Sequence, residues 1–177
     1  SAVSGHDFVD GDNDAFDEPG GRASGHGTFV AGIIHLVAPS ATIKSYRVMD
    51  ANGDGDGFTV ARAIEQAVAD GCSIINLSLA LTARNLAVRD AIDMASASGV
   101  LVVGGAGNLG DDAPVYPAAE VNILAVGALD SLSHKTDFSN YGNYVDLCAP
   151  GADVYSAYQT PYFAWWSGTS FSAPFVS

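Results

Sequence analysis

Two motifs in the sequence place side chains where they could act together on an amide bond. His26 is flanked by glycines and precedes an apolar run, so its imidazole would stand at the exposed start of a helix, as a general base requires. Ser170 lies in a Gly-Thr-Ser-Phe-Ser motif at a predicted helix start. That position would expose its hydroxyl and leave N–H groups free to hold an oxyanion. A structural histidine and a plain N-cap serine are the alternatives.

A third motif supplies a side-chain amide. Asn108 follows Gly-Ala-Gly at residues 105–107, directly after a predicted strand. An amide at the carboxyl end of a strand can donate to a developing oxyanion, although Gly-Asn more often marks a turn with positive φ. Each motif alone is modest evidence, whereas all three in the order His, Asn, Ser are specific.

The three motifs together resemble the histidine, asparagine and serine signatures of the subtilisin-like serine proteases, the subtilases. The resemblance runs from about residue 5 to the end of the sequence and includes residues 76–79, 116–118, 123–128, 138–142 and 149–151. It implies that His26 is the general base and then the acid, that Ser170 is the nucleophile, and that Asn108 helps to hold the oxyanion. The implied substrate is a peptide or protein, and no cofactor takes part in the chemistry.

The resemblance also implies two walls of a substrate cleft. One wall would be a strand that pairs with the substrate, formed by Ser78, Leu79 and Ala80. The other would be formed by Gly105, Ala106 and Gly107. Because these walls are small and uncharged, we expect an apolar side chain before the scissile bond. Ala80 stands where the family usually has glycine, and its methyl group would narrow the pocket.

The aspartate of the family's triad has no counterpart in the sequence. It normally lies upstream of the histidine in an Asp-Thr-Gly or Asp-Ser-Gly turn, and no such turn precedes His26. We expect the strand that carries this aspartate, and the tail of the C-terminal helix, to lie outside residues 1–177. These residues then form one incomplete peptidase domain that is weak or inactive as it stands. The alternative is a non-catalytic subtilase-like domain that binds peptides in its cleft.

The elements that must position these groups alternate along the chain. Hydrophobic patterns predict helices over residues 27–37 and 85–98, and a third that begins with Thr59 as its N-cap and ends at Gly71. Short strands are predicted over residues 42–48, 73–79, 100–103 and 123–126. This alternation predicts an α/β fold, a three-layer sandwich around a mostly parallel sheet, as in subtilisin. In such sheets the active groups lie at the carboxyl ends of the strands.

Charge and composition exclude several classes of function. The net charge is −13, with 17 Asp, 3 Glu, 2 Lys and 5 Arg, so nucleic acid is not an expected partner. No apolar run reaches the length of a membrane span. Acidity and family habit favour an extracellular protein, and the family adds a propeptide or inhibitor as a further partner.

Closely spaced carboxylates precede the histidine motif. Asp10, Asp12, Asp14 and Asp17 would repel one another unless a cation or water relieves them. They are therefore a candidate site for a structural calcium ion, with a solvated acidic loop as the alternative. Residues 50–55 match the first half of an EF-hand loop, but the twelfth position is Ala61 instead of the required glutamate.

Two remaining signals are interpreted as structural. Cys72 and Cys148 are too few for a disulfide framework and are predicted to be small buried hydrophobic residues. Residues 105–110 spell the Gly-x-Gly-x-x-Gly dinucleotide fingerprint, yet Asp111, Asp112 and Pro114 follow and predict a loop. Since the fingerprint needs a helix to begin at once, nucleotide binding is not expected.

Overall fold

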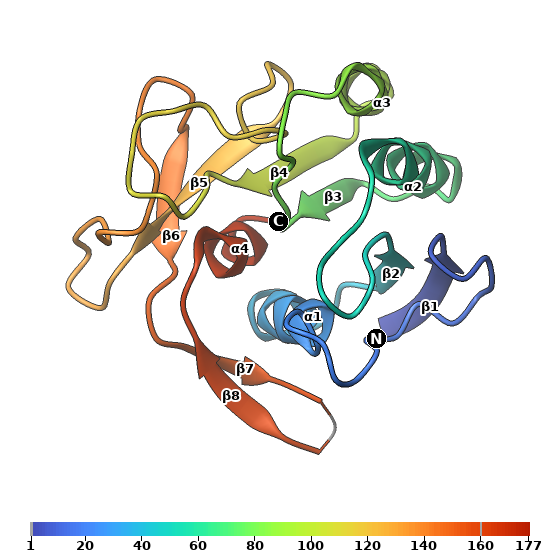
Figure 1. Cartoon of the computed structure of the whole chain (residues 1–177), viewed down its shortest axis with the longest axis horizontal. Coiled ribbons are helices and arrows are strands. Elements are labelled where there is room, and N and C mark those ends of the chain that lie inside the picture. The colour runs from blue at the N-terminus through green and yellow to red at the C-terminus, as the bar shows by residue number, and fades with distance from the viewer. Residues whose placement is uncertain (1, 160) are drawn as a thin grey trace.

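The computed structural model describes residues 2–159 and 161–177. Helices and strands alternate through the first two thirds of the chain, and strands dominate the last third before a short helix (Figure 1). The elements are β1 (Ala2–Asp7), α1 (His26–Val37), β2 (Ile43–Arg47), α2 (Gly57–Ala69), β3 (Ile74–Leu77), α3 (Leu86–Ala97), β4 (Leu101–Gly105), β5 (Leu124–Leu129), β6 (Leu147–Pro150), β7 (Val154–Ala157), β8 (Phe163–Trp166), α4 (Thr169–Ser172) and a 3-10 turn, η1 (Ala173–Phe175).

A parallel sheet with the strand order β3-β4-β5-β6 forms the centre of the molecule. The strands β1 and β2 pair in parallel as a separate ladder, and β7 pairs with β8 as an antiparallel hairpin. The parallel α/β fold predicted from the sequence is confirmed. In the described part of the chain, the ladder of β1 and β2 is not hydrogen-bonded to the central sheet.

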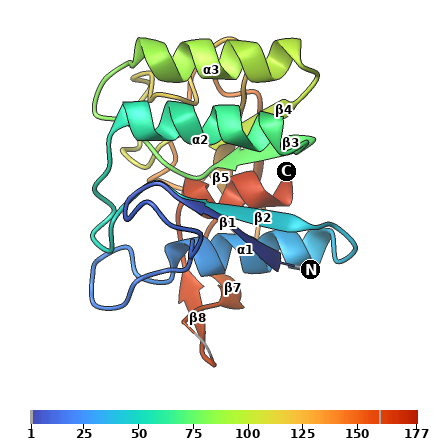
Figure 2. The same cartoon turned by 90° about the vertical axis from the view of Figure 1, so that its right-hand side faces the viewer.

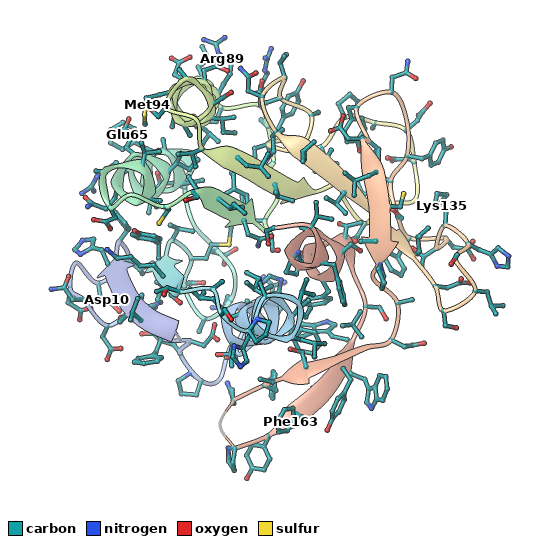
Figure 3. All side chains as sticks on the ribbon, turned by 180° about the vertical axis from the view of Figure 1, so that it is seen from behind. Asp10, Glu65, Arg89, Met94, Lys135 and Phe163 are labelled. Carbon is teal, nitrogen blue, oxygen red and sulfur yellow. The ribbon has the colours of Figure 1, made fainter. Side chains whose placement is uncertain are left out.

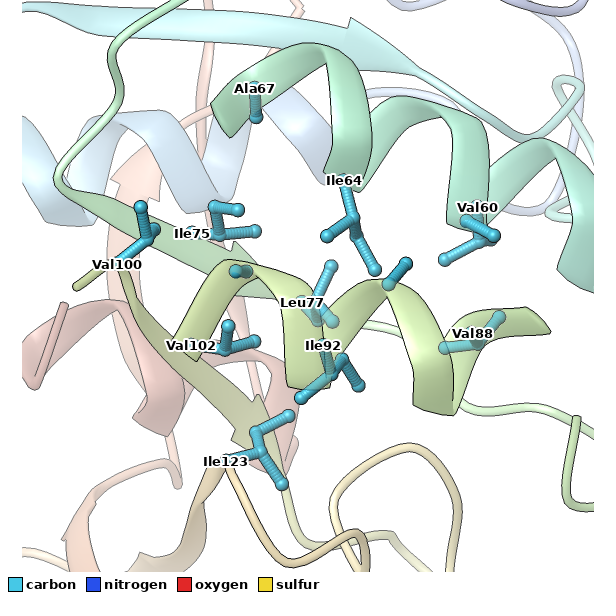
Figure 4. Packing of buried hydrophobic residues seen from close by; sticks show 13 residues of the cluster. Val60, Ile64, Ala67, Ile75, Leu77, Val88, Ile92, Val100, Val102 and Ile123 are labelled. Carbon is cyan, nitrogen blue, oxygen red and sulfur yellow. The ribbon is translucent and has the colours of Figure 1, made fainter. Parts of the chain in front are cut away.

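Helices cover both faces of this sheet. The helices α2 and α3 lie side by side on one face, and α1 and α4 lie on the opposite side (Figures 1 and 2). On the first face, Ile64 of α2 and Ile92 of α3 pack with Val102 of β4 in a continuous apolar cluster (Figure 4). On the other face, Val103 and Val126 pack against residues at the C-terminal turn. The central sheet is therefore packed on both faces.

Helix ends follow local rules, with one correction to the prediction. Asp56 caps α2 by accepting from the N–H groups of Phe58 and Thr59, so the prediction of Thr59 as the N-cap is wrong. Asp56 is the cap because it directly precedes α2, where its carboxylate reaches the free N–H groups of the first turn; Thr59 already lies within the helix. Gly71 and Gly99 follow α2 and α3 with φ values of 78° and 77°, as expected of glycines that end helices.

One other sequence expectation fails in the described structure. The prediction of a buried Cys148 is wrong, because this side chain is exposed; Cys72 is half-buried, and both thiols are free. The strand β1 has no apolar period, and its pairing with β2 supplies the order that its sequence does not reveal. Among the described residues, no helix combines the length and the apolarity that a bilayer crossing requires.

Candidate active site

Ser170 lies in the first turn of α4, as its motif predicted. Its side chain is partly exposed, whereas Thr169 beside it is buried. The end of β4 approaches this turn closely, because a Cβ atom on Gly105 would lie 2.9 Å from the backbone carbonyl of Thr169. Glycine at this position therefore lets the carboxyl end of β4 sit against the serine turn.

Asn108 is oriented by Thr169. The Oδ1 atom of Asn108 accepts from the backbone N–H of Thr169 at 2.8 Å and lies 3.1 Å from the Thr169 hydroxyl. That hydroxyl in turn accepts from the backbone N–H of Gly107 at 3.1 Å. Because Oδ1 is occupied, the Nδ2 donor, which has no hydrogen-bond partner among the described residues, remains available for a ligand. The positive φ of this turn lies at Gly107, 112°, and not at Asn108.

His26 begins α1, and its ring packs edge-on to Trp166 and tilted against Phe171, the residue next to Ser170. The ring centroids are 5.8 Å and 5.4 Å apart, respectively. Its imidazole forms no hydrogen bond with any described residue, and such catalytic bonds commonly tighten only when substrate is bound. Burial lowers the pKa of His26, and the nearby charge of Asp17 opposes that shift. The neutral imidazole that a general base needs is therefore favoured.

Asp17 caps the helix that carries His26. Its carboxylate accepts from the backbone N–H of Gly27 at 3.3 Å and of Thr28 at 2.7 Å, and from the Thr28 hydroxyl. These are N–H groups that the first turn of α1 cannot satisfy internally. A negative charge at this end also matches the helix dipole.

Arg47 is the cation at the centre of the acidic loop. Its guanidinium lies 2.6 Å from Asp7, 2.6 Å from Asp10 and 2.7 Å from Glu18. Burial raises the pKa of Asp7, but hydrogen bonds from the Asp10 backbone and from Arg47 outweigh it, so the net pKa is lowered. The sequence did not single out Arg47, although it is one of only seven basic residues.

The four aspartates predicted to bind calcium do not converge. Asp10, labelled in Figure 3, faces Arg47, and Asp12 accepts from the backbone N–H of Asp14 at 2.8 Å. Asp17 is used at α1. No three His, Cys, Asp or Glu side chains form a metal-binding group in the described ranges, so this arrangement does not fit the predicted ion. A melting temperature that rises on titration with calcium and falls with a chelator would show that the loop can rearrange around one.

One cavity of about 600 Å³ joins Ser170, the predicted nucleophile, to the predicted substrate residues. Ser170 and Asn108 line it, together with Leu79, Ala80, Gly105 and Gly107. Two predicted members lie elsewhere. The Ser78 hydroxyl donates to the Ser170 carbonyl oxygen at 2.6 Å, and Ala106 is fully buried.

The cavity has lining residues that the sequence did not reveal. Among them are Arg84, Val115 and Tyr116. The backbone N–H of Leu81 donates to the Tyr116 carbonyl at 2.7 Å, which joins the lining residues 79–84 to the lining residues 113–116. Residues 106–123 contain no helix, so the dinucleotide fingerprint lacks the element that it requires.

Comparison with known proteins agrees with this geometry. Residues 2–177 match the model of the subtilase family. Thermitase from Thermoactinomyces vulgaris is 41% identical over an alignment that covers 99% of this chain and 64% of that protein. Subtilisin Savinase from Lederbergia lenta is 36% identical, with 98% and 66% covered. A cold adapted subtilisin-like serine proteinase superposes with a TM-score of 0.91 at 35% identity, covering 99% of this chain and 64% of the other.

The chain thus spans a little less than two thirds of these relatives. The match extends over every described element and includes all three motifs. Those of Asn108 and Ser170 line the cavity, whereas His26 is not among its lining residues. By the family model and by its fold, the chain belongs to the subtilase family.

Proposed function

We propose that this protein is a serine endopeptidase that forms an acyl-enzyme on Ser170, with His26 as general base and Asn108 in the oxyanion hole. The observation that carries the proposal is that Ser170 and Asn108 line one cavity while Thr169 holds the Asn108 oxygen. This leaves an amide donor beside a nucleophile, which acyl transfer requires. Family membership supports the same chemistry.

The reaction follows from these groups. The Ser170 oxygen attacks the scissile carbonyl carbon while its proton passes to the His26 imidazole. The negative charge that develops on the carbonyl oxygen is stabilised by the Nδ2 group of Asn108. His26 then gives its proton to the leaving amine, and water, activated by the same imidazole, hydrolyses the acyl-enzyme. The lowered pKa of His26 keeps the base form available at neutral pH.

The substrate is a peptide or protein with an apolar stem before the scissile bond. The cavity walls at Leu79, Ala80 and Val115 are aliphatic, and they would enclose such a side chain. Ala80 and Val115 also add bulk, which favours slender side chains over broad aromatic ones. Cleavage of a peptide library mainly after phenylalanine, tyrosine or tryptophan would contradict this preference.

Covalent labelling with a fluorophosphonate probe tests the proposed chemistry. The expected result is a single adduct at Ser170, found by intact mass and peptide mapping, and its absence in a Ser170→Ala variant. An adduct on another serine would overturn the assignment of the nucleophile. The assay should be run on residues 1–177 and on the longest form that the gene encodes.

A non-catalytic peptide-binding domain is the second candidate. It is favoured by one observation, that no described carboxylate is hydrogen-bonded to His26. Loss of that partner costs a serine protease about 10⁴-fold in rate, so residues 1–177 alone should be weak. Peptide binding without Ser170 labelling, in the longest form as well, would favour this candidate.

The remaining parts of the proposal concern location and partners. We infer an extracellular protein from its acidity and from the family, and we infer a propeptide or inhibitor as a partner of the cleft. Detection of the protein in culture supernatant, against a cytoplasmic marker, tests the location.

A further inference from the structure

Among the described residues that line the proposed substrate cavity, Arg84 is the one with a charged side chain. The protein as a whole carries a net charge of −13, yet no Asp, Glu, Lys or His is among the described residues that line this cavity, and Arg84 is. The lining begins beside Ser170, where Ser78 contacts the serine carbonyl, and continues along residues 79–84. Arg84 thus lines the cavity at the other end of this segment from Ser78, the residue that contacts the Ser170 carbonyl.

Arg84 is held rigidly by two partners. Its Nε donates to Oε1 of Glu120 at 2.9 Å, and its Nη2 donates to Oε2 of Glu120 at 2.7 Å. The guanidinium also lies over the Tyr116 ring, 5.4 Å from its centroid. A bidentate pair and a cation–π contact together fix a long side chain that would otherwise lose entropy on binding a ligand.

The two members of this ion pair are unequally exposed. The Glu120 side chain is 3% exposed, whereas that of Arg84 is 46% exposed. The carboxylate therefore lies behind the guanidinium, and Nη1, which has no hydrogen-bond partner in the described ranges, remains a free donor.

We propose that Arg84 makes the cavity select peptide side chains that have an apolar stem and end in a carbonyl oxygen, as in glutamine or glutamate, in place of the wholly apolar side chain expected from the sequence. This inference rests on the proposed peptidase function. The aliphatic walls accept the stem, and Nη1 of Arg84 donates to the terminal oxygen. A lysine or arginine side chain brings only donors and a second positive charge, so it meets neither an acceptor nor an attractive field at Arg84.

Matched peptides that differ only in the residue before the scissile bond test the preference. The residues are glutamine, glutamate, methionine, which is a stem of similar length without the acceptor, and lysine. Equilibrium binding is measured by fluorescence anisotropy with a Ser170→Ala variant, and kcat/KM is measured with the longest form that the gene encodes. The expected result is that the glutamine or the glutamate peptide exceeds methionine by about tenfold in both measurements, and that lysine is the poorest.

The test variant must not leave the buried Glu120 carboxylate without a partner of opposite charge. Arg84→Met alone would leave the Glu120 carboxylate unpaired, so the test uses Arg84→Met combined with Glu120→Gln. This double variant should lose the advantage of the glutamine and glutamate peptides over the methionine peptide in both measurements. Arg89→Met is the matched control, because Arg89 pairs with Asp90 on the outer surface of α3 and does not line the cavity (Figure 3).

The two proposals fail in different ways. Cleavage at Ser170 with no advantage for glutamine or glutamate over methionine, or with an advantage that survives in the double variant, overturns the role of Arg84 alone. Tighter binding of the glutamine or glutamate peptide that is lost in the double variant, without cleavage of any peptide even by the longest form that the gene encodes, supports Arg84 and overturns the peptidase.

Discussion

The backbone N–H of Thr169 donates to the side-chain oxygen of Asn108 over 2.8 Å, and the Thr169 hydroxyl lies 3.1 Å from the same oxygen. An amide has its acceptor and its donor on opposite sides, so this pairing determines which side is presented to the cavity. Thr169 is 2% exposed and directly precedes Ser170, the proposed nucleophile. The orientation of the amide that we propose as the oxyanion donor is therefore tied to the position of Ser170.

Replacement of Thr169 by valine should lower kcat more than it changes KM. The variant keeps the backbone N–H bond to Asn108 but removes the hydroxyl, so one of two restraints on the amide is lost. One neutral hydrogen bond corresponds to about a fivefold to tenfold loss in kcat. The protein should also lose about 1 kcal/mol of stability, since the Gly107 N–H is left without its acceptor.

Thr59→Val provides the control for this prediction. The Thr59 hydroxyl also donates to a side-chain oxygen, that of Asp56 at 2.7 Å, but at the start of α2 and outside the cavity lining. Its loss should alter stability only. Equal effects of the two variants on kcat would show that Thr169 has no part in orienting Asn108.

Replacement of Ser78 by alanine should slow the labelling of Ser170 by a fluorophosphonate. The Ser78 hydroxyl accepts from Nδ2 of Asn76 at 2.9 Å and donates to the Ser170 carbonyl at 2.6 Å, so it fixes the backbone of Ser170. We expect a threefold to tenfold slower reaction, equivalent to about 1 kcal/mol. Ser98→Ala removes a hydroxyl that bonds a backbone carbonyl in α3, and it should leave the rate unchanged.

How much of this site could be predicted depends on the range of each interaction. The starts of α1 and α4 follow from local glycines and apolar runs, which is why His26 and Ser170 could be placed from the sequence. The contact between Ser78 and Ser170 joins residues 92 positions apart, and the pair of Arg84 and Glu120 spans 36. No local pattern encodes such contacts, so Arg84, Arg47 and the role of Thr169 emerge only in the folded chain.

Acid should destabilise the protein in part through His26. Burial lowers the folded-state pKa of this imidazole below its unfolded value of about 6.5. Above that pH both states are neutral and the group has no effect. As the pH falls below it, the unfolded state takes up a proton first, so unfolding is favoured.

A His26→Gln variant isolates this contribution. The difference in unfolding free energy between the variant and the unmodified protein should be constant above pH 7.5 and should shift in favour of the variant toward pH 5. Denaturant titrations at several pH values measure it. A difference that stays constant across that range would mean that His26 titrates alike in both states.

Asp17→Asn should lower the pKa of His26 further, because it removes the negative charge that opposes the effect of burial. It also weakens the cap of α1, since an amide oxygen accepts the N–H groups of Gly27 and Thr28 less strongly than a carboxylate. The stability loss should be about 1 kcal/mol. NMR titration of the imidazole resonances measures the pKa directly, and an unchanged or raised value would contradict the prediction.

Replacement of Arg47 by methionine should be the most damaging of these changes to stability. The Asp7 carboxylate is 1% exposed, and without Arg47 its charge is buried with only backbone N–H partners, which costs about 3 kcal/mol at neutral pH. The folded-state pKa of Asp7 is lowered, so the stability it contributes is present above its unfolded pKa, near 3.9, and is lost as the pH falls through the folded value.

The deficit of Arg47→Met should therefore shrink as the pH falls below 4, because Asp7 can then become neutral in the variant. Adding Asp7→Asn to Arg47→Met should restore part of the stability at pH 7, since the amide leaves no unpaired charge buried. Urea titrations of the single and double variants measure both effects. If the double variant is as unstable as Arg47→Met at pH 7, the packing of the Arg47 stem, and not its charge, holds the acidic loop to β2.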